Sequence, residues 1–264
     1  MTRIVLIIAS AATLVSGCGA NGSSSGKKTV VAAFYPLAYA AERIGGSAYD
    51  VENLTPPGAE PHDLELTPQA VARIQRAAVV LYLGNAFQPA VAKAVSGNGV
   101  DLLPGDGDPH LWLDPVLYAR TVRKIAAALD RPATPLLAQL RQLDAQYRRG
   151  LRDCRRREIV TSHEAFGYLA RRYRLRQVAI TGITPEAEPS PQRLAAVVRL
   201  VRKTHATTVF FERLVSPRLA DTVAREVGAK TAVLDPIEGQ EPGQTYFTLM
   251  RRNLAALRKA LGCR

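Results

Sequence analysis

The sequence predicts an α/β protein of two lobes, each a mainly parallel four-stranded sheet flanked by helices, with a single long helix joining the lobes. From residue 29 onward, short β-branched runs alternate with amphipathic segments. This alternation is typical of parallel sheets that helices cover on both faces. The length of 264 residues suits two such lobes.

Strands and helices alternate four times in the first half of the chain. Thr67-Pro68 and Asp114-Pro115 each place a capping residue before a proline at the first helical position, which is a typical helix start. We expect strands at residues 30–34, 51–54, 78–83 and 100–103, and helices at residues 37–44, 68–76, 89–95 and 115–128.

The second half of the chain repeats this order. Ser190-Pro191 is again a capping residue followed by proline. We expect strands at residues 158–161, 177–181, 207–211 and 231–234, and helices at residues 164–173, 191–203, 217–227 and 245–261.

A long amphipathic segment separates the two halves. Apolar residues recur there at helical spacing, with polar residues opposite them: Leu136, Leu137, Leu140, Leu143, Tyr147 and Leu151. A helix over residues 135–153 would be about 28 Å long at 1.5 Å per residue. It could be a crossover within one domain, but its place at the midpoint favours a rigid connection between lobes. The expected lobes are residues 29–131 and 154–264, with the linking helix in residues 132–153.

The first residues predict export and lipidation. Arg3 precedes a short apolar stretch at residues 4–15, which is shorter than the ~20 residues needed to span a bilayer. Leu14-Val15-Ser16-Gly17-Cys18 looks like a lipobox. We expect a signal peptide at residues 1–17, lipidation of Cys18, and a Gly/Ser-rich tether over residues 18–28 at the extracytoplasmic face of the cell membrane. The alternative is an ordinary secretory signal.

The two remaining cysteines, Cys154 and Cys263, are expected to form a disulfide, because an exported protein lives where disulfides persist. Free thiols are the alternative. Neither cysteine has a Cys or His at ligand spacing, which argues against a metal site there.

The net charge of +12 does not indicate nucleic-acid binding. Arginines are spread over most of the predicted helices, and the dense run around Arg155 has no interleaved aromatic residues. We interpret the charge as solvated surface, with some attraction to anionic lipid headgroups.

Three of the four histidines follow predicted strands, as does one aspartate. His62, His110, His163 and Asp235 each come after the carboxyl end of a strand, where open α/β sheets bind ligands. Imidazole nitrogen and carboxylate oxygen are zinc ligands. Four protein ligands leave no open position, which suits metal binding and not hydrolysis. His205 precedes its strand, and we expect it to be structural.

The segments around these residues resemble the metal-binding lipoproteins and periplasmic proteins of ABC transporters for zinc and manganese, in the cluster with a long backbone helix. The similarity covers nearly the whole chain after the signal. The segments that carry it are Gly58-Ala59-Glu60-Pro61-His62-Asp63, Asp108-Pro109-His110-Leu111-Trp112-Leu113-Asp114-Pro115, Ser162-His163-Glu164-Ala165-Phe166-Gly167-Tyr168, Glu186-Ala187-Glu188-Pro189-Ser190-Pro191 and Leu234-Asp235-Pro236.

The resemblance implies two lobes joined by a rigid helix, with one divalent ion between them. It also implies delivery to a membrane permease by a monomer that performs no chemistry. His at the third ligand position, here His163, resembles the zinc-binding members and Glu the manganese-binding ones. The chain lacks their His-rich loop between His62 and His110, so Mn²⁺ remains an alternative. Asp235 is the expected fourth ligand, with Glu60 or water as alternatives.

Two further expectations concern residues around the site. Glu212 could accept the ring N–H of a ligand histidine, or it could be a solvated carboxylate. Glu186 and Glu188 are expected at the mouth of the site or on the permease-facing surface, not as ligands.

Three rival functions remain. They are a manganese or iron binder of the same class, an exported zinc hydrolase with Glu164 as base, and a surface adhesin. The hydrolase is disfavoured because the sequence has no His-Glu-x-x-His motif.

Overall fold

The computed structural model describes residues 26–264 except positions 104, 106, 186 and 187. It contains two four-stranded sheets, and every pair of neighbouring strands is parallel. The predicted fold class is confirmed. In the first sheet, the order β2-β1-β3-β4 joins β2 (Tyr49–Asn53), β1 (Lys28–Ala32), β3 (Val79–Tyr82) and β4 (Gly99–Asp101). In the second sheet, the order β6-β5-β7-β8 joins β6 (Arg176–Ala179), β5 (Glu158–Thr161), β7 (Thr208–Phe211) and β8 (Lys230–Val233).

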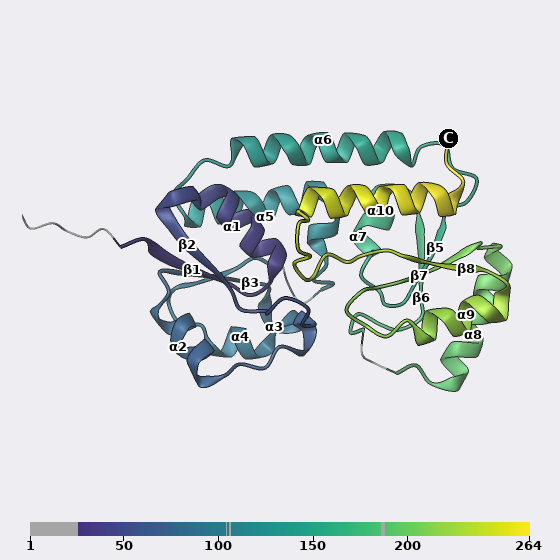
Figure 1. The fold of residues 1–264 in the computed structure, drawn as a ribbon, viewed down its shortest axis with the longest axis horizontal. Coiled ribbons are helices and arrows are strands. Elements are labelled where there is room, and N and C mark those ends of the chain that lie inside the picture. The colour runs from purple at the N-terminus through teal and green to yellow at the C-terminus, as the bar shows by residue number, and fades with distance from the viewer. Residues whose placement is uncertain (1–25, 104, 106, 186–187) are drawn as a thin grey trace, which may run out of the picture.

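Helices cover both faces of each sheet (Figure 1). On the side of the linking helix lie α1 (Tyr35–Gly45), α5 (Pro115–Ala128), α7 (Gly167–Arg172) and α10 (Tyr246–Leu261), and on the other side lie α2 (Pro68–Arg76), α4 (Pro89–Ala94), α8 (Pro191–Thr204) and α9 (Arg218–Val227). The short elements are α3 (Gly84–Phe87), η1 (Gly46–Ala48), η2 (Pro61–Asp63) and η3 (Leu111–Leu113). None of the helices in the described residues is long and apolar enough to cross a membrane.

The predicted helix caps are present. Thr67 accepts a hydrogen bond from the backbone N–H of Ala70, Asp114 accepts from Val116 and Leu117, and Ser190 accepts from Arg193. One predicted start is wrong, because α7 begins at Gly167 and not at residue 164. The N–H of Glu164 instead bonds the carbonyl of Gly182 in a neighbouring loop, so the segment after β5 stays irregular and carries His163.

The linking helix α6 (Thr134–Gly150) contacts elements of both lobes. It buries Leu136, Leu140, Leu143 and Tyr147, as the spacing predicted. Leu137 is only half-buried, and Leu151 is buried but follows the end of the helix. The helix contacts α5 of the first lobe and α10 of the second (Figure 1). The Tyr147 hydroxyl donates to the carbonyl of Met250 on α10 at 2.6 Å. The helix is therefore fixed to both lobes along its length.

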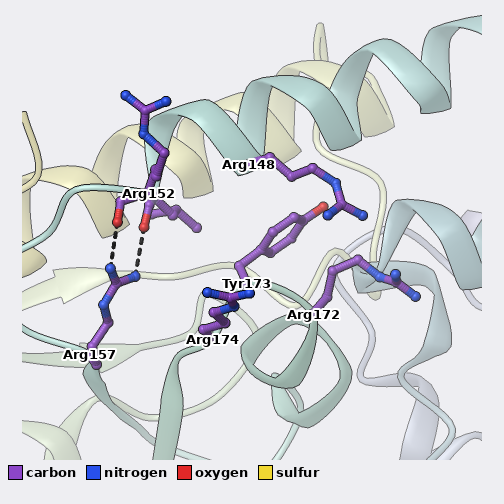
Figure 2. Close-up of a pocket in the computed structure, with 7 residues that line it drawn as sticks. Arg148, Arg152, Arg157, Arg172, Tyr173 and Arg174 are labelled. Carbon is purple, nitrogen blue, oxygen red and sulfur yellow. Dashed lines mark hydrogen bonds between the residues drawn. The ribbon is translucent and has the colours of Figure 1, made fainter.

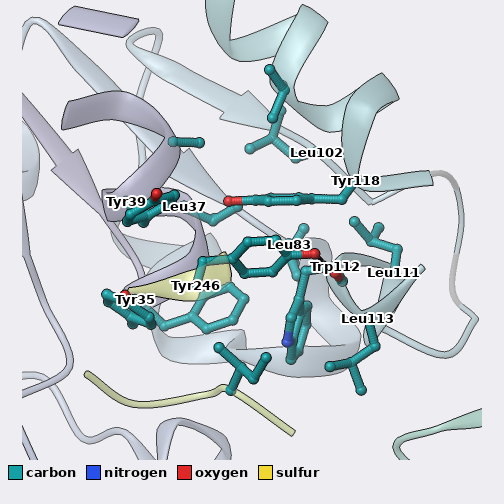
Figure 3. Close-up of a cluster of buried hydrophobic side chains, with 14 of the residues drawn as sticks. Tyr35, Leu37, Tyr39, Leu83, Leu102, Leu111, Trp112, Leu113, Tyr118 and Tyr246 are labelled. Atoms are coloured by element: carbon teal, nitrogen blue, oxygen red, sulfur yellow. Dashed lines mark hydrogen bonds between the residues drawn. The ribbon is translucent and has the colours of Figure 1, made fainter. Parts of the chain in front are cut away.

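Aromatic side chains from both lobes share one core (Figure 3). Tyr246 of α10 packs on Tyr118 of α5 with ring centroids 4.7 Å apart. Its hydroxyl donates to the carbonyl of Trp112 at 2.6 Å, and the indole N–H of Trp112 donates to the carbonyl of Pro236 at 2.6 Å. Since Trp112 belongs to the first lobe and Pro236 to the second, these buried contacts fix the position of one lobe relative to the other.

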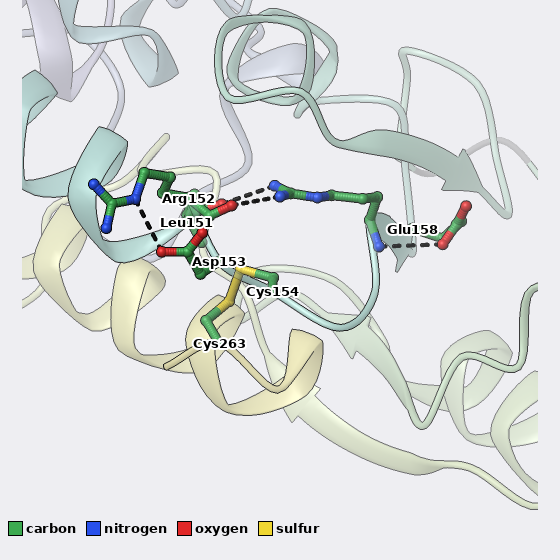
Figure 4. Close-up of a disulfide and its surroundings, with 7 residues drawn as sticks. Leu151, Arg152, Asp153, Cys154, Glu158 and Cys263 are labelled. Carbon is green, nitrogen blue, oxygen red and sulfur yellow. Dashed lines mark hydrogen bonds and ion pairs between the residues drawn. A yellow bond between two sulfur atoms is a disulfide. The ribbon is translucent and has the colours of Figure 1, made fainter.

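Cys154 and Cys263 form a disulfide (Figure 4). It links the segment after α6 to the end of α10, and the N–H of Arg264 bonds the carbonyl of Asp153 beside it. Near the bridge, the guanidinium of Arg157 donates to the carbonyls of Leu151 and Arg152. The last residues of the chain are therefore held in place.

Replacing both cysteines by serine is expected to lower the free energy of unfolding by about 2–4 kcal/mol, because the bridge closes a long loop in the unfolded chain. The sequence separation of the two cysteines is 109 residues. Urea unfolding of the oxidised protein and the double variant measures the difference. An unchanged unfolding midpoint would contradict this role.

Candidate metal site

Four side chains from both lobes meet between the two sheets. They are His62, His110, His163 and Glu238, whose ligand atoms all lie within 4.8 Å of one another. His62 lies on η2 after β2, His110 directly precedes η3, His163 follows β5, and Glu238 follows β8. His110 and His163 are 0% exposed and Glu238 is 1% exposed. The parallel strands bring the three histidines to the facing carboxyl edges of the sheets, as expected, together with Glu238, which was not expected there.

Four of the six distances between these ligand atoms are close to the edges of a zinc tetrahedron. Glu238 Oε1 lies 3.4 Å from His62 Nε2, 3.1 Å from His110 Nε2 and 3.7 Å from His163 Nε2. The Nε2 atoms of His110 and His163 are 3.2 Å apart. A tetrahedral ion with bonds of about 2.0–2.1 Å has ligand–ligand edges of about 3.3 Å. The three imidazoles and the carboxylate can thus hold one ion without a large rearrangement.

Carboxylates orient two of the histidine rings. His110 Nδ1 lies 2.7 Å from Asp108 Oδ1, and His163 Nδ1 lies 2.7 Å from Glu212 Oε1. Because a carboxylate accepts hydrogen bonds, it places the proton on Nδ1 and leaves Nε2 free to face the ion. Glu212 also accepts from Ser162 Oγ and from the backbone N–H of His163. Sequence reasoning singled out Glu212 but missed Asp108, although an aspartate two residues before a ligand histidine was visible.

Asp235 does not join the group, and its expected position is taken by Glu238. The carboxylate of Asp235 accepts from the N–H of Ile237 at 2.7 Å and from Arg213 Nε at 3.1 Å. The side chain of Asn253 holds both the N–H and the carbonyl of Asp235. β8 ends at Val233, so Asp235 lies in the turn that follows and shapes it, and the chain presents the carboxylate three residues later.

The turn before Glu238 contains a backbone conformation that is unusual for its residue. Ile237 has φ of 59°, in the left-handed region that β-branched residues avoid. Two hydrogen bonds hold this turn: the N–H of Ile237 donates to the carboxylate of Asp235, and the indole N–H of Trp112 donates to the carbonyl of Pro236. Such strain persists only where surrounding contacts enforce it. Here it aims Glu238 at the three histidines.

Glu60 adjoins the site without entering the group of four. Its Oε1 accepts from the N–H of His62 at 3.1 Å and so caps η2. Burial raises the pKa of Glu60 to about 9, and the nearby charge of Glu238 adds to the rise. Glu60 is therefore placed as a cap on the backbone at His62, beside the group of four.

The metal-free site carries a buried ion pair. Burial lowers the pKa of His110, but the hydrogen bonds and charges of Asp108 and Glu238 outweigh it and raise that pKa to about 9. Burial would raise the pKa of Glu238, yet its contacts with His110 and His62 hold it well below the usual value. Without an ion, a protonated His110 and an ionised Glu238 therefore balance one another.

The other candidate residues lie elsewhere. His205 ends α8 in a left-handed conformation and stands outside the group. Glu164 is exposed and is not part of the group, so it is not placed as a base. Glu188 lies in the loop before α8, whereas Glu186 lies outside the described residues. Cys18, the signal at residues 1–17 and most of the tether also fall outside them.

Comparisons with known proteins agree with this geometry. The high-affinity zinc uptake system protein ZnuA of Bacillus subtilis is 33% identical, over 97% of each chain. The zinc-binding lipoprotein AdcA of Streptococcus pneumoniae is 32% identical, and the match spans 61% of its length.

Solved structures show the same fold. The laminin-binding protein Lmb of Streptococcus agalactiae, described as having adhesin and metal-transporting activity, superposes with a TM-score of 0.83 at 30% identity, covering 89% of this chain and all of that one. The Zn(II)-bound ZnuA-like domain of Streptococcus pneumoniae AdcA has a TM-score of 0.75 at 34% identity, covering 89% and 99%. The model of the family "zinc-uptake complex component A periplasmic" matches residues 30–260. The chain therefore belongs to the ZnuA family of zinc-uptake binding components, which are not enzymes.

Proposed function

We propose that this chain captures one Zn²⁺ ion with His62, His110, His163 and Glu238 and delivers it to an ABC import permease. The observation that carries the proposal is the set of four ligand atoms within 4.8 Å of one another, in which Glu238 Oε1 lies 3.1–3.7 Å from Nε2 of each histidine. Zinc favours a mixture of imidazole nitrogen and carboxylate oxygen. The relatives named for zinc, including a domain described as Zn(II)-bound, support the same cargo. Manganese, which prefers oxygen ligands, fits three nitrogens less well.

The donor set favours transport over catalysis. All four positions around the ion are filled by protein groups, so no position remains for a reactive water. The exposed carboxylate of Glu164 is not near enough to the group to be counted with it. One chain supplies every ligand, and we therefore propose that the protein acts as a monomer.

We further propose that a lipid at Cys18 tethers the protein to the extracytoplasmic face of the membrane after removal of residues 1–17. Support comes from the lipobox-like run before Cys18 and from relatives that are named lipoproteins. Members of this family work outside the cytoplasm, and a tether keeps the loaded protein near its permease.

Glu238→Gln is expected to weaken zinc binding by on the order of 100-fold or more, because an amide is a poor ligand in place of a carboxylate. Asp235→Asn is the matched control. It removes a charge from the neighbouring turn but no ligand, and its loss should be smaller. Competitive titration against a zinc chelator measures both affinities. A larger loss for Asp235→Asn would return the fourth ligand to Asp235.

Zinc affinity is expected to rise from pH 7 to pH 9 by up to about tenfold per unit, since the ion displaces the proton of His110. That proton has a pKa of about 9 in the metal-free protein. The raised pKa also stabilises the metal-free fold fully below about pH 6.5, the unfolded value, and this contribution disappears as pH rises through 9. Calorimetry at pH 7.5 in two buffers of different ionisation enthalpy counts the protons released. Asp108→Asn should reduce that number, and absence of proton release would contradict a charged His110.

Trp112→Phe is expected to weaken zinc binding by roughly tenfold, because the buried carbonyl of Pro236 loses its only described donor. The loss should act through Glu238, which follows in the same turn. A double-mutant cycle with Glu238→Gln therefore tests it: once Gln replaces the ligand, Trp112→Phe should change affinity little. Equal losses in both backgrounds would mean that Trp112 supports the fold alone.

A further inference from the structure

The three helices α5, α6 and α10 carry most of the excess positive charge of the protein. α5 has three cationic residues, α6 has three and α10 has four, and all of these side chains are exposed. The only acidic residue on the three helices is Asp144. We call this set the basic ridge: Arg120, Arg123, Lys124, Arg141, Arg148, Arg149, Arg251, Arg252, Arg258 and Lys259.

The three helices of the ridge lie on one side of the two sheets and together span both lobes (Figure 1). α6 lies outermost, with α5 of one lobe and α10 of the other between it and the sheets (Figure 1). α2, α4, α8 and α9 lie on the opposite side of the sheets. The helices that carry the cations therefore lie on the α6 side of the sheets, while the metal ligands lie at the facing edges of the sheets.

The charge of the ridge is not balanced within the fold. Asp144 pairs with Arg148, and Glu241 pairs with Arg252. Arg141, Arg149, Arg258 and Lys259 make no ion pair with any described residue. Cations near a helix C-terminus interact favourably with the helix dipole, and this accounts for the cationic residues in the last turns of α6 and α10. It does not account for Arg120, Arg141 or Arg251, so an external anionic surface is the better explanation.

A cavity of about 300 Å³ at the C-terminal end of α6 adds ordered guanidinium groups to the ridge (Figure 2). Arg157 is held there by the carbonyls of Leu151 and Arg152, and Arg172 is held by Asp114. Guanidinium groups fixed in this way match the oxygens of a phosphate group. The complete lining is Arg148, Leu151, Arg152, Arg157, Arg172, Tyr173 and Arg174.

The chain enters the described fold beside the same ridge. Residues 26–28 line a surface hollow together with residues 129–131, which form the connection from α5 to α6. Even fully extended, the backbone from Cys18 to residue 26 spans at most about 30 Å. If Cys18 is lipidated, the part of the first lobe around this hollow must therefore stay close to the bilayer.

We propose that the basic ridge docks the protein on the anionic lipid headgroups of the membrane to which it is tethered. The inference rests on the proposed anchor at Cys18, which holds the protein at the membrane but does not set which face of the protein approaches the bilayer. A polybasic surface sets that face where the lipids are anionic. Docking by the ridge leaves the ligand loops outside the docking plane, so the protein can capture its ion while docked.

The test measures which face of the full-length lipoprotein approaches the bilayer. A fluorophore is attached at Ala138→Cys on α6 or at Ala195→Cys on α8, and a quencher is carried on lipid headgroups. The vesicles contain phosphatidylcholine alone or with roughly one third phosphatidylglycerol. Quenching at position 138 should be at least about threefold greater on the anionic vesicles and should fall in about 0.5 M NaCl. Position 195 should show no such increase.

Two charge variants complete the experiment. Changing Arg141, Arg149, Arg258 and Lys259 to Gln should abolish the increase at position 138. The matched control changes four exposed cations on the second lobe, Arg199, Lys203, Arg218 and Lys230, to Gln and should preserve it. Equal quenching on both vesicle types, or equal loss in both variants, would overturn ridge docking.

Flotation of the same samples with neutral vesicles separately reports the anchor. Protein that fails to float there lacks the anchor. Ridge docking predicts that such anchor-free protein still floats with anionic vesicles, though not with neutral ones. Failure to float with anionic vesicles would overturn the docking proposal.

Discussion

The site depends on a fixed distance between two lobes. Its ligands come from loops of both sheets, and a zinc tetrahedron tolerates errors of only a fraction of an ångström in their separation. The hydrogen bonds from Trp112 to Pro236 and from Tyr246 to Trp112 cross between the lobes beside these loops. α6 and the shared aromatic core add stiffness over a longer range. The packing of aromatic side chains outside the ligand set therefore fixes the distance between the ligands, and with it the size of ion that the site can hold.

Burying several acidic groups around one small volume creates an electrostatic problem, which the site solves in two ways. Glu212 faces Nδ1 of His163, and Asp108 faces Nδ1 of His110. Each carboxylate therefore has a ring N–H as its partner, which offsets the repulsion between the acidic groups and orients the two imidazole rings. Glu60 stays protonated because burial and Glu238 disfavour its charge. The remaining charge on Glu238 is matched by protonated His110 when no ion is present. An incoming dication takes the place of that proton beside Glu238.

The distribution of charge gives the two sides of the protein different partners. Carboxylates such as those of Asp108, Glu212 and Glu238 gather at the ends of the strands, where a cation is taken up. Cations gather on the outer helices, where their field extends toward solvent. A net charge of +12 would repel a metal ion if it were spread evenly. Separation of the two signs lets one molecule attract Zn²⁺ at one place and an anionic surface at another.

The strands, the helix caps, the long helix and the three histidines of the site could all be predicted from the amino-acid sequence. These features are local: β-branched runs, Ser/Thr/Asp before proline, and helical spacing of leucines each depend on near neighbours in the chain. Their positions at the ends of parallel strands were enough to place His62, His110 and His163 together.

Contacts between segments that are distant in the sequence determine which carboxylate meets the histidines. After β8 the chain turns through Ile237 in a left-handed conformation. This turn is held by Asn253 of α10 and Arg213, both of the same lobe, and by Trp112 of the other lobe. The direction of Glu238 is therefore set by contacts with distant segments, which no spacing around Asp235 reveals. The same holds for the late start of α7, where a bond to the loop at Gly182 replaces the first helical turn.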